Sequence, residues 1–490
     1  MRHHLISRPG AARVLARAAV LLILLEWVSC ALAQNVPLSP DHAWHGPGES
    51  SIQAESKNLP EPKLKLDSGK TYTLPELIDM AESHNPETRF AWERARAQAA
   101  ALGVARSELY PTLAAAALAG VEREPTYFTD RFYRQTKADF EVAWNLNYTI
   151  FDFGARAGRI DAASAEVLAR NFAFNDTHRS IIYRVQQAYY QLLNAYGQED
   201  AVRASLSNAQ SVEQAAEERL NNGLATLPDV LESRSATAQA RYELQSVLGA
   251  EQIAAGNLAT VLGASPDSPL HVQPLKELAI PESTNDSVDV AIERALAQRP
   301  DLLRQVADVK AAKGTVKEAR AAYYPSLSVT ASPAAQSWYG LQQQFPWGHT
   351  AGLYGEMSFN LNWTVFDGGA RKNRLAEAQA NVHATEAQVN VSRDQIANEV
   401  WAAFSDFHTA LRQREAATAL LEAASRSYEA ALKSYNYGLR NLLDVTAAQR
   451  TLAQARSTDV LARTQVLTTL ANLAFRTGDS IQLNAMSPRP

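Results

Sequence analysis

The sequence predicts an α+β membrane protein with an internal duplication, long antiparallel helical hairpins and four β-strands per chain. Three observations predict this fold class. A set of motifs recurs about 215 residues apart, two segments alternate large apolar and polar residues, and two long proline-free stretches carry apolar residues at helical spacing.

The N-terminus has the features of a secretory signal peptide. A basic region precedes the short apolar run 18–25, and small residues at 31–33 fit a cleavage site before Gln34. The apolar run is much shorter than the ~20 residues that a transmembrane helix needs. We therefore expect residues 1–33 to be removed from the mature protein.

Cys30 is the only cysteine of the chain, and two interpretations of it remain open. Val28-Ser29-Cys30 is close to a lipoprotein cleavage box, which makes Cys30 a candidate lipidation site, although Trp27 stands where that box favours leucine. Alternatively, the cysteine is discarded with the signal peptide. In either case the mature chain cannot form an internal disulfide.

Composition and motifs exclude several classes of function. Loss of the signal peptide, which carries a net charge of +3, changes the formal charge from −5 to −8. Nucleic-acid binding requires clustered lysine and arginine, so no nucleic-acid partner is expected. The sequence contains no Gly-rich phosphate loop, HExxH, zinc-type cysteine cluster or GxSxG elbow. We therefore predict neither an enzyme nor a cofactor or metal site.

Two halves of the chain match in register. The segment 145–156 recurs as 360–371, and both copies contain Phe-Asp-x-Gly-Ala-Arg. A Gly-Leu pair followed by aspartate recurs at the same offset of 215 residues, and a Tyr-Pro pair recurs at an offset of 214. So many landmarks kept in register predict a duplicated fold.

The repeat divides the chain into six predicted segments. They are a signal peptide 1–33, an extended N-terminal tail 34–70, a first structural repeat 71–263, a Pro- and Ser-rich linker 264–286, a second structural repeat 287–479 and a C-terminal tail 480–490. Each repeat is expected to contain a helix from Pro86 or Pro300, then a β-hairpin (113–151 or 327–366), then a helical hairpin (156–262 or 371–477).

The strand prediction rests on a period of two. Large apolar residues alternate with polar ones from Phe140 to Ile150 and from Met357 to Val365. The length suits a membrane strand of ~9–11 residues with one face toward lipid. A soluble hairpin with one buried face gives the same alternation, so the pattern alone leaves both alternatives open.

The helix prediction rests on long stretches without proline, 157–227 and 347–487. Their apolar residues follow the alternating spacing of three and four that is typical of coiled coils. A helix over 156–222 would be ~100 Å long, too long for the core of a compact globule. Glycine ends the long helices. The return helices are expected to begin near Asp229 and Asp444, where a negative N-cap is favourable.

These elements require assembly. Four strands cannot close a barrel, which needs about eight, and an open edge in lipid costs several kcal/mol per unpaired backbone group. The strands must then be pooled in a symmetric oligomer. Three chains with twelve strands are one of several physically allowed solutions.

Over about residues 72–479 the sequence resembles the outer membrane factor family, the TolC-like proteins. The resemblance is carried by the duplication, the Tyr-Pro pairs, both Phe-Asp-x-Gly-Ala-Arg turns, the Gly-Leu turns followed by Asp-Val, and two short motifs, His84-Asn85-Pro86-Glu87 and Arg299-Pro300-Asp301-Leu302. It implies a homotrimer with a shared 12-stranded β-barrel in outer membrane lipid and a long periplasmic α-barrel. It also implies a passive exit duct in the Gram-negative outer membrane that works with a periplasmic adaptor and an inner membrane pump, for efflux or type I secretion.

The resemblance also implies a periplasmic gate. Tyr435 and Arg440 match the family's gating tyrosine and arginine, Asp229 matches their acidic partner on the other hairpin, and Asp444 matches an acidic ring. The second acid of that ring is replaced by Ala447. The turns that close the tunnel and contact the adaptor correspond to Gly223, Leu224, Gly438 and Leu439.

Simpler structural interpretations of the same residues remain open. Asp229 and Asp444 can be simple helix caps, and Asp152 and Asp367 are expected to cap the strand-to-helix turns. A periplasmic or surface coiled-coil structural or adhesion protein would also explain the helices. It would not explain two amphipathic hairpins that interrupt them at matching positions.

Overall fold

The computed structural model describes residues 41, 48–58, 64–128, 131–275, 278, 287–342 and 348–479, in two compact units, 1–63 and 64–490. The predicted signal peptide with Cys30 and the predicted C-terminal tail lie outside the described residues. In the first unit, α2 (Glu49–Lys57) begins after Gly48, with an acid in its first turn and a lysine in its last. A helix therefore stands where we expected only an extended tail.

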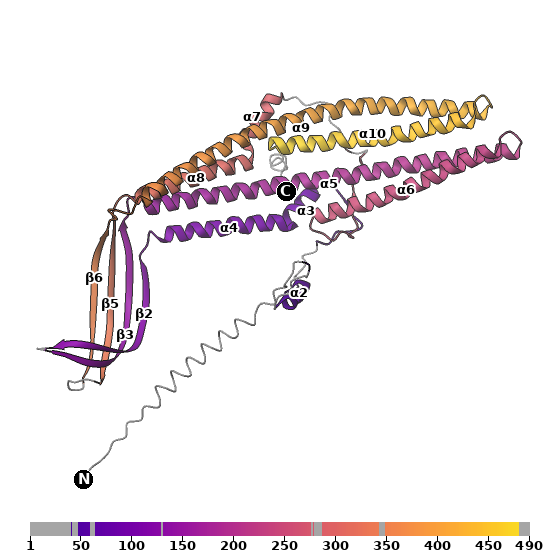
Figure 1. Cartoon of the computed structure of the whole chain (residues 1–490). Coiled ribbons are helices and arrows are strands. Elements are labelled where there is room, and N and C mark those ends of the chain that lie inside the picture. Colours follow the sequence, from indigo (N-terminus) through magenta and orange to yellow (C-terminus); the bar gives the residue numbers. More distant parts are fainter. Residues whose placement is uncertain are drawn as a thin grey trace, which may run out of the picture. The chain divides into compact units, whose positions relative to one another are not determined.

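The second unit contains elements of the same kinds, in the same order, in each half (Figure 1). The first half contains β1 (Thr71–Tyr72), α3 (Leu74–His84), α4 (Pro86–Ser107), β2 (Thr112–Phe128), β3 (Arg131–Phe151), α5 (Ala155–Asn221) and α6 (Leu227–Val261). The second half contains β4 (His271–Val272), α7 (Val288–Gln298), α8 (Pro300–Ala321), β5 (Ser326–Gln342), β6 (His349–Asn362), α9 (Ala370–Asn436) and α10 (Leu442–Thr477).

A short helix precedes each of the helices that begin at Pro86 and Pro300, and neither short helix was predicted from the sequence. Asn85 and Arg299 have extended backbone conformations between two helices, because a residue before proline resists the helical region. The preceding helices, α3 and α7, are only 11 residues long. The short parallel pair β1·β4 lies in the same middle region.

The residue at each helix break, Asn85 or Arg299, is hydrogen-bonded to the C-terminal end of α6 or α10. Asn85 donates a side-chain hydrogen bond to the carbonyl of Val261 (2.9 Å). Arg299 donates to the carbonyl of Arg476 (3.4 Å) and pairs with Glu399 (2.9 Å). Because Arg299 is buried, this pairing offsets the cost of removing its charge from water.

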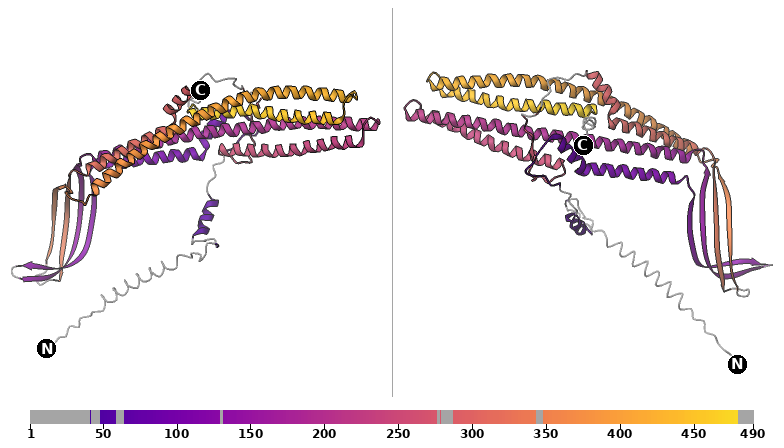
Figure 2. Two further views of the ribbon diagram at one scale, coloured as in Figure 1. Left: turned by 45° about the horizontal axis from the view of Figure 1, so that its top comes forward. Right: turned by 180° about the vertical axis from the view of Figure 1, so that it is seen from behind.

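The helices form a layer of four side-by-side segments. Near the sheet, α5 packs between α4 and α8, and α9 packs on α8. Toward the other end, α6 and α10 take the places of α4 and α8, as Figure 2 shows. The predicted apolar seam of α5 is buried here, with Val185, Tyr189 and Leu192 fully inaccessible to solvent. Among the described residues, no helix combines the length and the apolar character required to cross a membrane.

The sheet lies at one end of this layer, with antiparallel order β2-β3-β5-β6 (Figure 1). The alternation of apolar and polar residues predicted that the last strand continues to Val365, but β6 ends at Asn362. The matching end of β3 remains a strand because it pairs with β5, for example Tyr148 with Val329. Residues 363–366 follow an edge strand and have no such partner among the described strands.

The large apolar side chains of the sheet lie on its exposed face. Phe140, Val142 and Trp144 of β3 are 49–53% exposed, and Phe359 and Leu361 of β6 are 65–70% exposed. This is the reverse of a soluble hairpin, which would bury that face against its own chain.

The other face of the sheet is polar. Its side chains bond to one another between strands: Ser332 donates to Asn145 (3.0 Å), and Gln336 donates to Asp139 (3.1 Å). At the strand-to-helix turns, Asp152 and Asp367 accept bonds from the backbone N–H groups two and four residues later, which confirms that they are caps.

The backbones of the two halves approach closely where α5 crosses α8. A Cβ atom on Gly158 would lie 2.6 Å from the backbone nitrogen of Glu318, and one on Gly314 would lie 2.6 Å from that of Ala162. Arg159 reinforces the crossing through an ion pair with Glu318 (3.0 Å). Side chains cannot be accommodated here without separating the helices.

We predict that Gly158→Ala lowers the free energy of unfolding by about 1–3 kcal/mol, since the added methyl group must push backbone away. Thermal unfolding of the detergent-purified protein measures this. Gly103→Ala in α4, where a Cβ meets nothing within 4 Å in the chain, is the control and should cost nothing. Equal stability of the two variants would contradict the close contact.

Candidate functional site

The two helical hairpins turn at the end of the layer opposite the sheet (Figure 1). Gly223 and Gly438 adopt left-handed conformations, with φ of +70° and +75°. Leu224 donates its backbone N–H to the carbonyl of Arg219 (2.8 Å), and Leu439 repeats this with Ser434 (2.8 Å). These are Schellman-type endings that glycine makes possible. Leu224 and Leu439 are left exposed at the tips.

Asp229 lies in the first turn of α6. The N-cap is Thr226, whose backbone N–H (2.8 Å) and hydroxyl (2.7 Å) donate to the Asp229 carboxylate. Asp229 is therefore the third helical residue of a capping box, not the N-cap that we expected. The hydrogen bonds from the Thr226 N–H and hydroxyl, with a lesser contribution from the charge of Arg219, hold the pKa of Asp229 below its usual range, although burial opposes them.

Asp444 occupies the matching place in α10. Asn441 is the N-cap there and accepts from the backbone N–H of Asp444 (3.0 Å). Since α10 begins at Leu442, the expectation that the helix starts at Asp444 is wrong by two residues. Its carboxylate still lies in the first turn, where negative charge is favourable.

Arg219 joins the two hairpins within one chain, a contact that was not predicted from the sequence. Its guanidinium donates to the carbonyl of Tyr435 (2.7 Å) and lies over the Tyr435 ring, 4.6 Å from the ring centroid. A cation there faces the C-terminal ends of both α5 and α9, and it also gains a cation–π contact. A usable signal was present, because Arg219 is a basic residue in the last turn before Gly223, whereas the second half has Ser434 at that place.

The expected gate residues are only partly brought together. Tyr435 is buried, and its hydroxyl has no hydrogen-bond partner among the described residues. Burial first, and then the charge of Asp229, raise the pKa of Tyr435, while Arg219 lowers it. Arg440 is exposed and bonds to none of the residues that the structure describes, Asp229 included. A single chain therefore contains an Arg219–Tyr435 contact but no Arg440–Asp229 contact.

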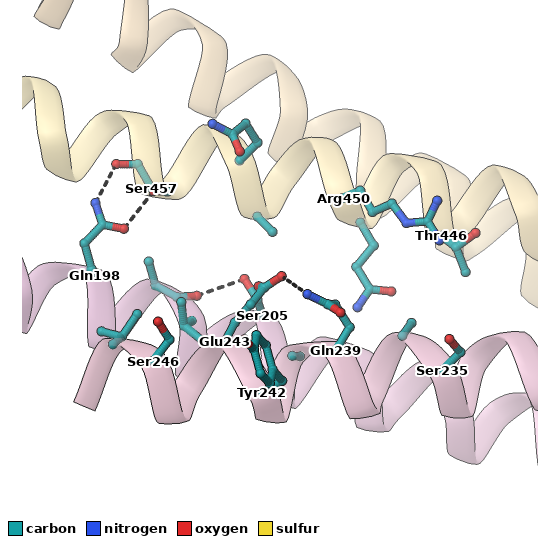
Figure 3. A pocket seen from close by; sticks show the side chains of 18 residues that line it. Gln198, Ser205, Ser235, Gln239, Tyr242, Glu243, Ser246, Thr446, Arg450 and Ser457 are labelled. Carbon is teal, nitrogen blue, oxygen red and sulfur yellow. Dashed lines mark hydrogen bonds between the residues drawn. The ribbon is translucent and has the colours of Figure 1, made fainter. Parts of the chain in front are cut away.

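A polar groove of about 700 Å³ runs between α5, α6 and α10 (Figure 3). Near one end Gln198 donates to the carbonyl of Ser457 (2.9 Å), and the Ser457 hydroxyl donates back to Gln198 (2.7 Å). Toward the tips, Arg450 bridges to Glu232 (3.1 Å).

Comparison with known proteins gives a clear family signal. The family described as "Outer membrane efflux protein" matches this chain over residues 77–264 and 291–479. The chain is 30% identical to Protein CyaE of Bordetella pertussis over 431 residues, 87% of each protein. It is 25% identical to the outer membrane protein OprJ of Pseudomonas aeruginosa over 442 residues, 88% of this chain and 89% of OprJ.

Solved structures share the fold. A membrane protein from Pseudomonas aeruginosa superposes with a TM-score of 0.74 at 24% identity, over 85% of this chain and 97% of the other. The outer membrane protein VceC from Vibrio cholerae gives a TM-score of 0.70 at 22% identity, over 83% and 96%. The chain therefore shares the fold of these two membrane proteins.

We predict that Arg219→Ala speeds amide hydrogen exchange in the last turns of α5 and α9 together, because one side chain holds both ends. Exchange followed by mass spectrometry over residues 217–224 and 432–439 measures this. Arg234→Ala, which removes an exposed pair with Glu217 near the same tip, is the control and should leave α9 unchanged. Unaltered exchange in α9 of the Arg219 variant would disprove the contact.

Proposed function

Because the chain belongs to the outer membrane efflux protein family, we propose that three copies of it form the passive exit duct of a tripartite efflux pump or type I secretion system. The duct lies in the outer membrane of a Gram-negative cell and extends into the periplasm. The exposed apolar face of an open four-stranded sheet is the observation that carries this proposal. That face suits lipid, and four strands cannot seal themselves.

A homotrimer satisfies both requirements. Twelve pooled strands close a shared β-barrel whose polar face lines the lumen, and they leave no strand edge in lipid. The helical layers of the three chains then form an α-barrel below it. An internal duplication is supported by the same order of elements in both halves. It is also supported by the equivalent hydrogen bonds of Asn85 and Arg299 to the ends of α6 and α10.

The helical tips are the proposed periplasmic gate and adaptor contact. Thr226 donates to only one oxygen of the Asp229 carboxylate, Oδ2, and Arg440 is exposed to solvent, so we assign the Arg440–Asp229 bond to neighbouring chains. The adaptor meets Gly223, Leu224, Gly438 and Leu439, and an inner membrane pump supplies the cargo. The duct itself performs no catalysis. A coiled-coil structural or adhesion protein is not supported, because the family match includes the strands as well as the helices.

We predict that the detergent-purified protein inserted into a planar lipid bilayer gives discrete ion-conducting channels of uniform size. The lumen is passive, so conductance needs no nucleotide or ion gradient beyond the applied voltage. Absence of channels from a folded, inserted preparation would contradict the duct.

We predict that Arg440→Ala raises single-channel conductance several-fold. An exposed ion pair is worth only ~0–1 kcal/mol, but symmetry removes three at once. Arg426→Ala, on α9 before the turn that contains Arg440, is the control; Arg426 pairs with Glu422 within the chain, so this variant should conduct as the unsubstituted protein does. Unchanged conductance of the Arg440 variant would rule out its role in the gate.

A further inference from the structure

β2 and β3 continue beyond the other strands of the sheet. The pairing of β3 with β5 ends at Thr136, opposite Gln342, whereas β2 and β3 remain paired as far as Phe128 and Arg131. Residues 123–128 and 131–136 therefore form a two-stranded ribbon that β5 reaches only at its base. Figure 1 shows this ribbon turning aside from the direction of the four strands, at the end of the sheet away from the helices.

The apolar band of the sheet ends where the ribbon begins. On the exposed face the apolar side chains of β3 run from Ile150 to Phe140, and those of β2 run from Leu113 to Val121. Both lengths match the ~9–11 residues with which a tilted strand crosses a bilayer. In the proposed duct the ribbon therefore begins at the outer edge of the hydrocarbon.

One face of the ribbon carries cations and, among its described residues, no carboxylate. Because side chains alternate along a strand, Arg123 and Arg134 lie on the face that continues the apolar band. Both arginines are exposed, and neither forms a hydrogen bond or an ion pair with the residues that the structure describes. Glu122 and Glu124 lie on the opposite face, where they pair with Lys137 (3.5 and 2.8 Å). The two arginine charges are thus left uncompensated on the lipid-facing side.

The two arginines are neighbours on this face. Arg123 lies opposite Thr136, and Arg134 lies opposite Pro125, so their Cα atoms are diagonal neighbours ~7–8 Å apart. Two cations at this spacing repel each other. A phosphate group between them would remove the repulsion, because it accepts charge-assisted hydrogen bonds from both guanidinium groups.

An aromatic pair completes this face at the end of the ribbon. Tyr127 and Phe132 lie opposite each other with their ring centroids 5.1 Å apart, and they are 60% and 69% exposed. Amphipathic rings of this kind are enriched at the headgroup level of membranes. Exposed rings beside uncompensated cations are typical of surfaces that bind anionic lipid.

The arginines also stand at the height of the headgroups. Arg123 is two residues beyond Val121, and Arg134 is level with Pro125, four residues beyond it. At ~3.3 Å per residue and a tilt of ~35–45°, these positions are about 5 and 10 Å above the hydrocarbon. The headgroup layer is ~5–8 Å deep on each side of a bilayer. The long arginine side chain spans the remaining difference.

We propose that Arg123 and Arg134 bind the phosphate groups of lipid headgroups in the outer leaflet of the membrane. This proposal rests on the proposed function, which places the sheet in the outer membrane, and it adds a lipid-binding surface to the duct. A lipid fits this surface better than a dissolved anion does, because apolar side chains adjoin the arginines on both sides, Val121 toward the membrane and the aromatic pair beyond.

Native mass spectrometry of the detergent-purified full-length protein with lipid A, a phosphate-bearing lipid of Gram-negative outer leaflets, tests this. The double variant Arg123→Gln with Arg134→Gln is expected to bind lipid A ~30-fold more weakly than the unsubstituted protein, from about fivefold for each basic residue near an anionic lipid surface. Dephosphorylated lipid A should bind the unsubstituted protein and the double variant equally weakly.

Two further variants make the test decisive. Arg241→Gln with Arg412→Gln removes two exposed arginines of α6 and α9, so it changes the charge equally and should leave lipid A binding unaltered. Arg123→Lys with Arg134→Lys keeps the positive charges and should bind within about threefold of the unsubstituted protein. This second variant tests the proposal even where the glutamine variant does not assemble.

The outcomes separate the lipid site from the duct. Equal binding of lipid A before and after the Arg123 and Arg134 substitutions, an equal loss in the Arg241 and Arg412 variant, or equal binding of phosphorylated and dephosphorylated lipid A overturns the lipid site. The duct stands in each case when the same preparation is trimeric and conducts in a planar bilayer. A preparation that is monomeric and forms no channels overturns the proposed function as well.

Discussion

Unpaired backbone groups at the two edges of the β2-β3-β5-β6 sheet are the constraint on which the rest of this structure depends. In water such edges are hydrated, but in lipid each unpaired group costs several kcal/mol. The sheet also exposes its apolar face, and contact of that face with water would be unfavourable. Only lipid on the outside, together with other strands at both edges, satisfies both conditions.

The helical layer connects this sheet to the helical turns at the other end of the molecule. Two glycines let α5 and α8 meet backbone to backbone beside the sheet. Midway, the buried Arg179 of α5 holds the halves together, because it lies 3.6 Å from Asp301 and donates a hydrogen bond to the carbonyl of Phe475 (2.9 Å). The two halves of the chain therefore act as one rigid, elongated unit. At the far end the two hairpins are joined by Arg219 with Tyr435 at the turns and by the exposed pair of Arg450 with Glu232 nearby. A gate placed there disturbs neither the sheet nor the core.

The sequence predicted features that depend on local chemistry. Glycine turns, alternating strands and the 67-residue helices follow from positive φ, a period of two and the absence of proline. It did not predict α3 and α7, because 11-residue helices before Asn85 and Arg299 leave too short a pattern. It extended β6 beyond Asn362, because alternation reports where a strand is favourable but not whether a partner is present. Arg219 escaped notice because its contacts lie 216 residues away in the sequence.

The mass of the protein in detergent tests the central claim most directly. Native mass spectrometry of the purified full-length chain should find three copies held together, with detergent required to keep them in solution. A single folded chain that stays soluble in plain buffer would contradict the claim, because its strand edges and apolar sheet face would then need neither lipid nor neighbours.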